Sequence, residues 1–396
     1  MKAAKIVAIL FALPLLLTCE LFSGPNDREN PKDPLNPNYA GWFGVKTIDS
    51  TNDVGKYASM KVSGSNVFIS YFNAPSGPTR FASSSDGGMT WATKPATSSA
   101  DIAGNPSAIA IRQKGSFFDI ALIYQDGQRL RARKSPDSGA AWFDVATHPD
   151  VANTVLNDCS LAAGSGADDT YYASYYAKTM GTGKLFFAKS TSGGSNWIAG
   201  GLVYPLTSDD IGKFSSIAVQ GTAVFIAHQN ITTQKLAVTK STDGGTAWQT
   251  VDVDIAPLTD LGGTSIATLD GTNVYVSYFD GSNLKFAKSA DAWATFSGPR
   301  VVSLNGGISP SIAVSAGKIY VSHFHATSGD LLFTRSDDLG ATWITPPIVV
   351  DIGLGSNPVG KSTSIAVDGT SVYIAYYDFT NGDLKVAKSI DNGDTW

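Results

Sequence analysis

The stretch SSDGGMTW, residues 84–91, is one copy of a pattern that occurs seven times along the chain. The pattern reads Ser-x-Asp-x-Gly-x-x-Trp, and its copies are Ser84–Trp91, Ser135–Trp142, Ser190–Trp197, Ser241–Trp248, Ser289–Phe296, Ser336–Trp343 and Ser389–Trp396. Successive copies end 47 to 55 residues apart. A repeat of this period is typical of solenoids and propellers, so it has to be interpreted before any local feature.

Each copy has the composition of a tight turn. The aspartate can accept backbone N–H groups of its own turn, the glycine permits a positive φ, and the tryptophan buries a large apolar surface over the turn. We assign a structural role to the aspartates Asp86, Asp137, Asp243, Asp291, Asp337 and Asp391. Two copies depart from the pattern, because Ser192 replaces the aspartate of the third and Trp293 and Phe296 replace the glycine and tryptophan of the fifth.

Strand-forming runs surround every turn. In the last repeat, SIAV (364–367), VYIAYY (372–377) and LKVAK (384–388) precede the turn, and in earlier repeats a further run follows the tryptophan. The runs are almost wholly apolar, so both faces of each sheet must be buried. A radial array of sheets meets that need. We therefore predict an all-β fold, a seven-bladed β-propeller of four-stranded antiparallel blades.

The seventh repeat stops at Trp396, before its fourth strand. The segment WFGVKTID, residues 42–49, looks like the run that follows the tryptophan in other repeats. We predict that this segment is the outer strand of the last blade and closes the ring. The propeller then spans residues 42–396, about 51 residues per blade.

The seven turns resemble the Asp box, or BNR repeat, of the sialidase-like propellers. That resemblance covers residues 42–396 and implies the same fold. It also implies a set of catalytic groups: three arginines for the sialate carboxylate, a tyrosine nucleophile with a glutamate, an aspartate acid/base and an Arg-Ile-Pro motif. This chain departs from that set, because its glutamates are Glu20 and Glu29, both before the propeller, and it has no Arg-Ile-Pro.

The N-terminus predicts export and a lipid anchor. Lys2 and Lys5 precede an apolar run, residues 6–17, that is too short to span a bilayer and typical of a signal peptide. The run ends LLTC at Cys19, which resembles the lipobox of bacterial lipoproteins. We therefore expect a signal peptide at 1–19, an acylated Cys19, a proline-rich flexible tether at 20–41, and a location in the bacterial cell envelope. An ordinary signal peptide that happens to contain a cysteine is the alternative.

The overall composition limits the partners. The net charge is −5 with no long basic run, so nucleic acid is not an expected partner. We also expect no metal and no cofactor. Cys159 occupies a repeat position held elsewhere by Ser215, Thr264 and Thr363, which favours a small buried thiol over a nucleophile.

Candidate ligand contacts follow the second strand of each repeat. Those strands end near an aromatic position held by Tyr71, Tyr124, Tyr175, His228, Tyr278, His323 and Tyr376, where we interpret both histidines as packing residues. Two residues further on, the candidates for ligand binding are Asn73, Asp126, Asn230, Asp280, His325 and Asp378. Simple turn formation by Asn and Asp is the alternative interpretation.

Two functions remain open from the sequence. The first is a membrane-tethered, non-catalytic propeller that binds a glycan or protein, favoured by the missing catalytic set and by repeats so alike that none is specialised. The alternative is an exo-acting, sialidase-type glycoside hydrolase that uses two of Asp126, Asp280 and Asp378, which requires carboxylates about 5–10 Å apart.

Overall fold

The computed structural model describes residues 43–396 except 76, 99–102, 166–168, 180, 205–206, 257–261, 269–271, 292 and 354–357. The predicted signal peptide with Cys19 and the predicted tether at 20–41 lie outside the described residues. In the part of the chain that is described, no helix is long and apolar enough to cross a membrane.

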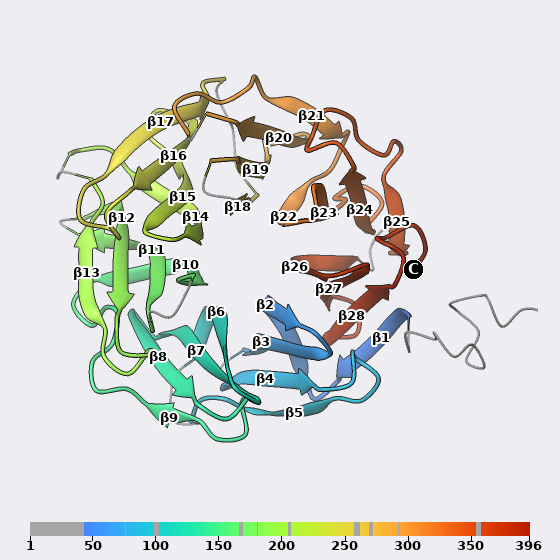
Figure 1. Cartoon of the computed structure of the whole chain (residues 1–396), viewed down its shortest axis with the longest axis horizontal. Coiled ribbons are helices and arrows are strands. Elements are labelled where there is room, and N and C mark those ends of the chain that lie inside the picture. The colour runs from blue at the N-terminus through green and yellow to red at the C-terminus, as the bar shows by residue number, and fades with distance from the viewer. Residues whose placement is uncertain are drawn as a thin grey trace, which may run out of the picture. The chain divides into compact units, whose positions relative to one another are not determined.

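The described residues form seven four-stranded antiparallel sheets, which Figure 1 shows as blades around a central axis. Blade 1 consists of β2 (Asp53–Ser63), β3 (Asn66–Ala74), β4 (Thr79–Ser84) and β5 (Ala92–Pro95). Blade 2 consists of β6 (Ala103–Lys114), β7 (Phe117–Asp126), β8 (Arg129–Ser135) and β9 (Phe143–Asp144). Blade 3 consists of β10 (Thr154–Ala163), β11 (Tyr171–Thr179), β12 (Thr182–Ser190) and β13 (Ile198–Leu202). Blades 4 and 5 consist of β14 (Ile211–Gln220), β15 (Ala223–Asn230), β16 (Lys235–Ser241) and β17 (Gln249–Asp254); and β18 (Thr264–Thr268), β19 (Val274–Phe279), β20 (Leu284–Ser289) and β21 (Arg300–Ser303). Blades 6 and 7 consist of β22 (Ile308–Ser315), β23 (Lys318–Phe324), β24 (Leu331–Ser336) and β25 (Ile348–Asp351); and β26 (Val359–Asp368), β27 (Ser371–Asp378), β28 (Asp383–Ser389) and β1 (Gly44–Asp49). The predicted seven-bladed propeller is confirmed.

The second strand of each blade explains the apolar runs. In β3, residues 67–72 are all buried, on both faces of the sheet. Each blade packs between two others, so successive side chains of a middle strand meet the two neighbouring blades in turn. A run without alternation is therefore what this position in a propeller requires.

The ring closes through the segment predicted to close it. Strand β1 pairs antiparallel with β28, from Gly44 opposite Lys388 to Thr47 opposite Lys385. Blade 7 therefore has the strand order β1-β28-β27-β26, with its outer strand supplied from the other end of the propeller. Lys388 reinforces the junction with blade 1, because its Nζ donates to the carbonyl oxygen of Gly87 at 2.8 Å.

The repeated turns share one hydrogen-bond pattern. In the first turn, Ser84 Oγ donates to Asp86 at 2.7 Å, Gly88 N–H donates to Ser84 Oγ at 2.8 Å, and Thr90 N–H donates to Asp86 at 2.9 Å. The same aspartate contacts recur at Asp137, Asp243, Asp291 and Asp391. Each carboxylate thereby satisfies the backbone of its own turn.

The assignment in the sixth turn is wrong by one residue. Ser336 Oγ and Thr342 N–H donate to Asp338, at 2.8 and 2.7 Å, and not to Asp337. Hydrogen bonds from Thr342 and Ser336 lower the pKa of Asp338 to about 2. Asp337 instead forms ion pairs with Lys318 and Arg335. The sequence SDDLG offers two adjacent aspartates, and only the third position of the turn points its carboxylate at the turn backbone.

The tryptophans of the turns pack across the blade interfaces. They form edge-on contacts with a third-strand phenylalanine of the preceding blade, in the pairs Trp142–Phe81, Trp248–Phe187, Trp343–Phe286 and Trp396–Phe333, with ring centroids 4.9–5.1 Å apart. The glycine of the turn is required by the same phenylalanine. At Gly139, whose φ is +86°, a Cβ atom would lie 2.2 Å from the ring of Phe81.

Candidate functional site

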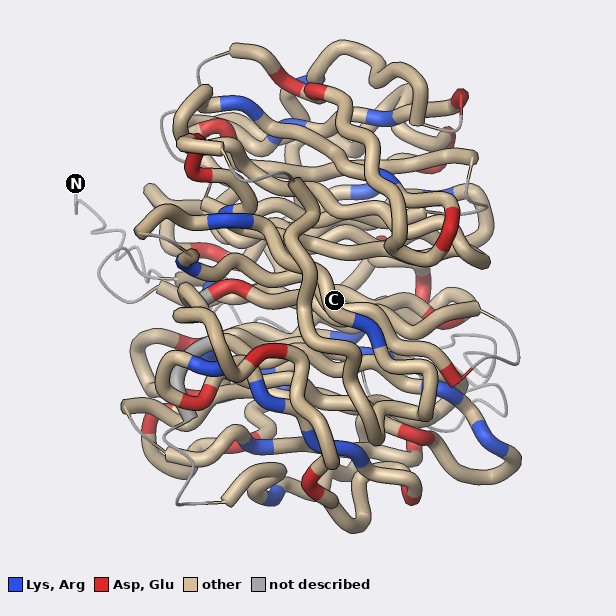
Figure 2. The backbone as a smooth tube through the Cα atoms, turned by 90° about the vertical axis from the view of Figure 1, so that its left-hand side faces the viewer, with Lys and Arg blue, Asp and Glu red and all other residues tan. Residues whose placement is uncertain are grey.

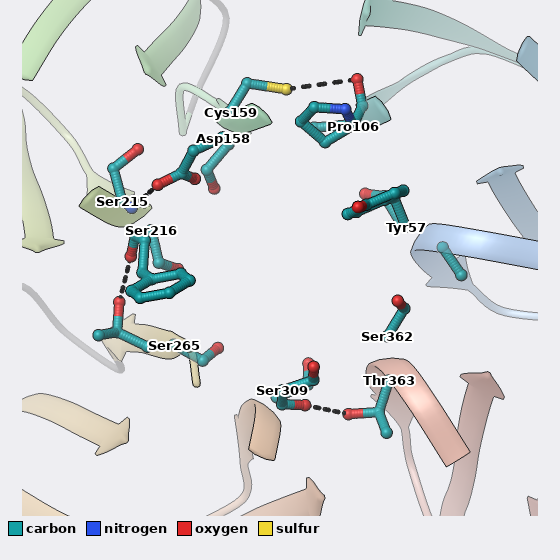
Figure 3. A pocket seen from close by; sticks show the side chains of 18 of the residues that line it. Tyr57, Pro106, Asp158, Cys159, Ser215, Ser216, Ser265, Ser309, Ser362 and Thr363 are labelled. Carbon is teal, nitrogen blue, oxygen red and sulfur yellow. Dashed lines mark hydrogen bonds between the residues drawn. The ribbon is translucent and has the colours of Figure 1, made fainter. Parts of the chain in front are cut away.

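The innermost strands of the blades line a cavity on the propeller axis, with a volume of about 320 Å³. Figure 3 shows residues from several blades facing it. Because every inner strand is the edge of its sheet, its outward N–H and C=O groups have no partner within the blade and need one from elsewhere.

A ring of serines supplies the N–H groups with acceptors. Each serine Oγ accepts the N–H of the next blade at 2.9–3.3 Å, in the pairs Met60–Ser364, Ile109–Ser59, Ile217–Ser160, Ile266–Ser216, Ile312–Ser265 and Ile365–Ser311. At the remaining step, between blades 2 and 3, Ala108 stands in the serine position. The serine ring is therefore interrupted once among the described residues, beside blade 3.

Three of the residues immediately before the serine-ring position contact carbonyl groups of the preceding blade. Thr264 donates to the carbonyl oxygen of Phe214 at 2.5 Å and Thr363 to that of Ser309 at 2.8 Å. The thiol of Cys159 takes the same place, with its Sγ 3.9 Å from the carbonyl oxygen of Pro106. Burial raises the pKa of the Cys159 thiol. The thiol is thus neutral at physiological pH, as expected of a buried structural cysteine and not of a nucleophile.

One position further toward the strand start, four blades carry a left-handed bulge residue. Tyr57, Phe214, Ser309 and Ser362 have φ values of +51° to +57°, and the strand register shifts around each of them. Bulges change the direction of a side chain, and left-handed non-glycine residues are costly and concentrate at functional sites. All four line the axial cavity.

Blade 3 places Asp158 at this same position. Asp158 is the one carboxylate among the described residues that line the cavity. It accepts the N–H of Ser215 from blade 4 at 2.7 Å (Figure 3). Burial raises its pKa well above the ordinary value, against the lowering effect of that hydrogen bond and of the charge on Lys213.

The interpretation that no blade is specialised is therefore wrong at the axis. Blade 3 has Asp158 and Cys159 at the two positions where blade 6 has Ser309 and Pro310. At the serine-ring position, blade 2 has Ala108 where the other six blades have serine. A repeat scaffold needs no such departures, so departures that gather in adjacent blades at a cavity mark a candidate site.

The six predicted ligand contacts lie elsewhere. They end the second strands of six different blades or follow them directly, and none of them lines the axial cavity. Asp280 accepts N–H groups of Ser282 and Asn283, and Asp378 accepts those of Thr380 and Asn381.

The other four have comparable local contacts. Asn230 accepts the N–H of Thr233, Asp126 forms an ion pair with Arg131 at 2.6 Å, and the carbonyl oxygen of Asn73 accepts the N–H of Gly77. His325 accepts the N–H of Ser328 and lines a separate cavity of about 440 Å³ between blades 5 and 6. The structure does not bring these residues together, and ligand contact by any of them remains a prediction.

The aromatic position two residues earlier locks neighbouring blades. Tyr71, Tyr278 and Tyr376 each donate to an aspartate that ends the outer strand of the preceding blade, at 2.6 Å. In blades 4 and 6 a hydroxyl replaces that aspartate. His228 lies 2.8 Å from the hydroxyl of Tyr204, and His323 lies 3.1 Å from that of Ser303. Burial lowers the pKa of His228 to about 4 and that of His323 to about 3, so both are neutral packing residues.

Asp158 and the bulge residues were not predicted as site residues. Their signal is a repeat column of unlike residues, directly before the column that contains Cys159: Tyr57, Pro106, Asp158, Phe214, Gly263, Ser309 and Ser362. Such a column carries no secondary-structure pattern, and its meaning depends on the axis that the seven blades create together.

No protein-family model matches the sequence, and no curated protein matches it. Among solved structures the chain is similar to an ulvan lyase bound to -[GlcA(1-4)Rha3S]-, at 11% identity over 89% of this chain and 96% of that chain, with a TM-score of 0.55. It is also similar to Aleuria aurantia lectin in complex with alpha-methyl-L-fucoside, at 13% identity over 78% of this chain and 99% of that chain, with a TM-score of 0.52. The Hadza microbial sialidase Hz136 overlays at a TM-score of 0.48 and 15% identity, over 84% of this chain and 65% of the sialidase. The similarities to the lyase and the lectin agree with the propeller fold.

Proposed function

We propose that this chain is a membrane-tethered, non-catalytic propeller that binds a glycan at its axial cavity. The main support for this proposal is that several residues lining the cavity differ from those at the equivalent positions of other blades. They are Asp158 and its neighbours in blade 3, and the bulge residues Tyr57 and Phe214. We also propose that the seven turns are Asp boxes and that the propeller belongs to the sialidase-like group. Their shared serine, aspartate and glycine contacts support that assignment.

The chemistry of the cavity suits a sugar. Sugars present hydroxyl groups around a ring and C–H groups on its faces. Binding sites for small ligands combine apolar and aromatic walls with a few placed polar groups, in volumes of about 300–1,000 Å³. Here Tyr57 and Phe214 supply aromatic surface, while Asp158, Ser309 and Ser362 supply polar groups. The cavity is at the small end of that range, which favours one sugar unit of a longer glycan.

The solved structures with this fold point in the same direction. Two of the similar propellers have a glycan or glycoside bound, one a lyase and one a lectin. Nucleic acid is not an expected partner, because Lys/Arg and Asp/Glu positions are interspersed along the backbone in Figure 2 and the net charge is −5.

Hydrolysis is the weaker alternative. A glycoside hydrolase needs two carboxylates about 5–10 Å apart across the scissile bond. Asp126, Asp280 and Asp378 belong to blades 2, 5 and 7, and each is engaged within its own blade. The described lining of the axial cavity offers Asp158 alone. A single carboxylate supports recognition better than it supports double-displacement or inverting chemistry.

A glycan array with the purified protein tests the proposal. We expect binding that weakens at least about ten-fold in Tyr57→Ala and in Asp158→Ser, because an aromatic face or a buried hydrogen bond contributes about 1–3 kcal/mol. Asp158→Ser copies the residue of blades 6 and 7, so the fold tolerates it. Asp378→Asn is the control and should bind normally. Loss of binding in Asp378→Asn but not in Asp158→Ser would move the site to the second-strand loops, and turnover of a fluorogenic sialoside would establish the alternative.

The anchor is tested separately. Cys19→Ser should release the protein from the membrane fraction into the soluble fraction, because lipidation of Cys19 is the expected attachment. Metabolic labelling with palmitate should mark the wild type and not the variant. A variant that still sediments with membranes would contradict the lipoprotein assignment.

A further inference from the structure

A single lysine interrupts a column of alanines at the propeller axis. The residue two positions after the serine-ring position is alanine in six blades, at Ala110, Ala162, Ala218, Ala267, Ala313 and Ala366. In blade 1 it is Lys61. The strand pairing confirms that these positions are equivalent. Each lies opposite the second residue of the apolar run in the second strand of its blade, as in the pairs Lys61–Phe68, Ala218–Phe225 and Ala366–Tyr373.

The fold does not require a lysine at this position. Six blades pack with a methyl group, so the geometry of the inner strands is complete without a long charged side chain. The ammonium group of Lys61 forms no hydrogen bond and no ion pair with any residue that the structure describes. Burial lowers the pKa of its ammonium group, which reflects the cost of holding a charge away from water without a partner.

Lys61 lines the same axial cavity as Asp158, Tyr57 and Ser362. The two charged groups have different surroundings. The Asp158 carboxyl group accepts the N–H of Ser215, whereas no described residue accepts a hydrogen bond from the ammonium group of Lys61 or pairs with it. The ammonium group of Lys61 is left as the unmatched charge of the cavity.

We infer that Lys61 is a recognition group for an oxyanion carried by the ligand of the axial cavity, a carboxylate or a sulfate ester. This inference deepens the proposed function and rests on it, because it assigns an anionic class to the glycan. An ammonium group in a partly desolvated cavity forms strong charge-assisted hydrogen bonds with such oxygens. The cost of burying Lys61 unpaired in the free protein is then offset in the complex.

Calorimetric titration of the full-length protein with four probes tests the inference. The probes are methyl glucuronide, glucose 6-sulfate, the neutral methyl glucoside and inorganic sulfate. We expect the wild type to bind at least one charged sugar about ten- to a hundred-fold more tightly than the neutral one, as a hydrogen bond to a charged group allows. The two charged sugars distinguish a carboxylate from a sulfate ester as the recognised group.

Three variants isolate the ammonium group. Lys61→Ala copies the other six blades and should keep a melting temperature at or above that of the wild type, while the preference for the charged sugar disappears. Lys61→Met keeps the length of the side chain without its charge and should lose the preference equally. Lys94→Ala removes a lysine whose Nζ donates to the carbonyl oxygen of Ala140, outside the cavity lining, and should keep the full preference.

The outcomes separate this inference from the proposed function. Equal affinity of the wild type for charged and neutral sugars, or a preference that survives in Lys61→Ala, overturns the inference and leaves glycan binding in place. If no sugar binds, the proposed function fails. Inorganic sulfate then decides the inference alone: it stands if the wild type binds sulfate and Lys61→Ala does not, and it is wrong if both proteins behave alike.

Discussion

Asp158 shows what a single residue can reveal in a repeat protein. Its neighbours in the column are aromatic, small or hydroxylated side chains, and it alone brings a carboxylate to the axial cavity among the described residues. It caps the N–H of Ser215, which any good acceptor could do. The cost of burying the acid is therefore not needed for that hydrogen bond.

This cost predicts how stability depends on pH. Below about pH 4 the carboxyl is neutral in the folded and the unfolded chain and contributes no difference. Between about pH 4 and its raised pKa, the unfolded chain releases a proton that the folded protein retains, so folding becomes less favourable as the pH rises. Asp158→Asn keeps the acceptor for Ser215 and removes the titration. We expect its free energy of unfolding, relative to the wild type, to increase from pH 4 to pH 7 in urea melts. A constant difference across that range would contradict the raised pKa.

The role of a residue was predictable where it follows from the residue type and its position in the repeat. The turn aspartates follow from their motif, and the one error, Asp337 for Asp338, arose where two aspartates stand side by side. The packing role of His228 and His323 was predictable because both replace a tyrosine of the repeat. Asp158 and Lys61 were not, because their significance depends on a cavity that no single repeat contains.

At the scale of strands and turns, one irregular repeat has a physical explanation. Trp293 replaces the turn glycine in blade 5 and adopts a φ of +84°. The third strand of the preceding blade, β16, carries Val238 where blades 1, 3, 5 and 6 carry the phenylalanine that contacts the turn. Trp293 packs in the same core cluster as Val238, and its Nε1 donates to the carbonyl oxygen of Val238 at 3.3 Å. A large residue in the turn thus fills the space that a small residue in the strand leaves.

A double-mutant cycle tests this compensation. Trp293→Gly should cost about 3–5 kcal/mol of unfolding free energy, because it leaves a cavity, and Val238→Phe alone should cost about 1–3 kcal/mol by overpacking. The two substitutions together restore the phenylalanine and glycine that meet at four other blade interfaces, so the double variant should be more stable than the sum predicts, with a coupling of about 1–3 kcal/mol. Additive effects in chemical denaturation would exclude the compensation.

Strand positions were predictable from the sequence to a large extent. The apolar runs predicted the middle strands, and the run after each turn predicted the outer ones. The bulges at Tyr57, Phe214, Ser309 and Ser362 were not predictable, because a positive φ at a residue other than glycine violates local preference and depends on contacts with neighbouring blades.

At the scale of the whole molecule, closure of the ring joins segments from the two ends of the propeller. Strand β1 completes blade 7 through its pairing with β28. It also serves blade 1, because Asp49 at its end accepts hydrogen bonds from Tyr71 at 2.6 Å and from Arg80 at 2.8 Å. The strand therefore connects the first and last blades in two ways.

Removal of residues 42–49 should destabilise the propeller substantially. The deletion leaves β28 without an outer partner, uncovers the core against which Ile48 packs, and leaves Tyr71 and Arg80 without their acceptor. We expect a loss of about 3 kcal/mol or more in the free energy of unfolding. Deletion of residues 20–41, the predicted tether, is the control and should leave the melting temperature almost unchanged. An unchanged melting temperature in the 42–49 variant would contradict the role of β1 in closure.

The pairing of β1 with β28 also has a consequence for the order of folding. Six blades consist of strands that follow one another directly, so their contacts are local in the chain and can form early. The contact between Gly44 and Lys388 joins residues 344 positions apart (388 − 44), and closing so long a loop is slow. We therefore expect β1 to dock last, which makes the edge of β28 the surface most exposed to mispairing with another chain until the ring has closed.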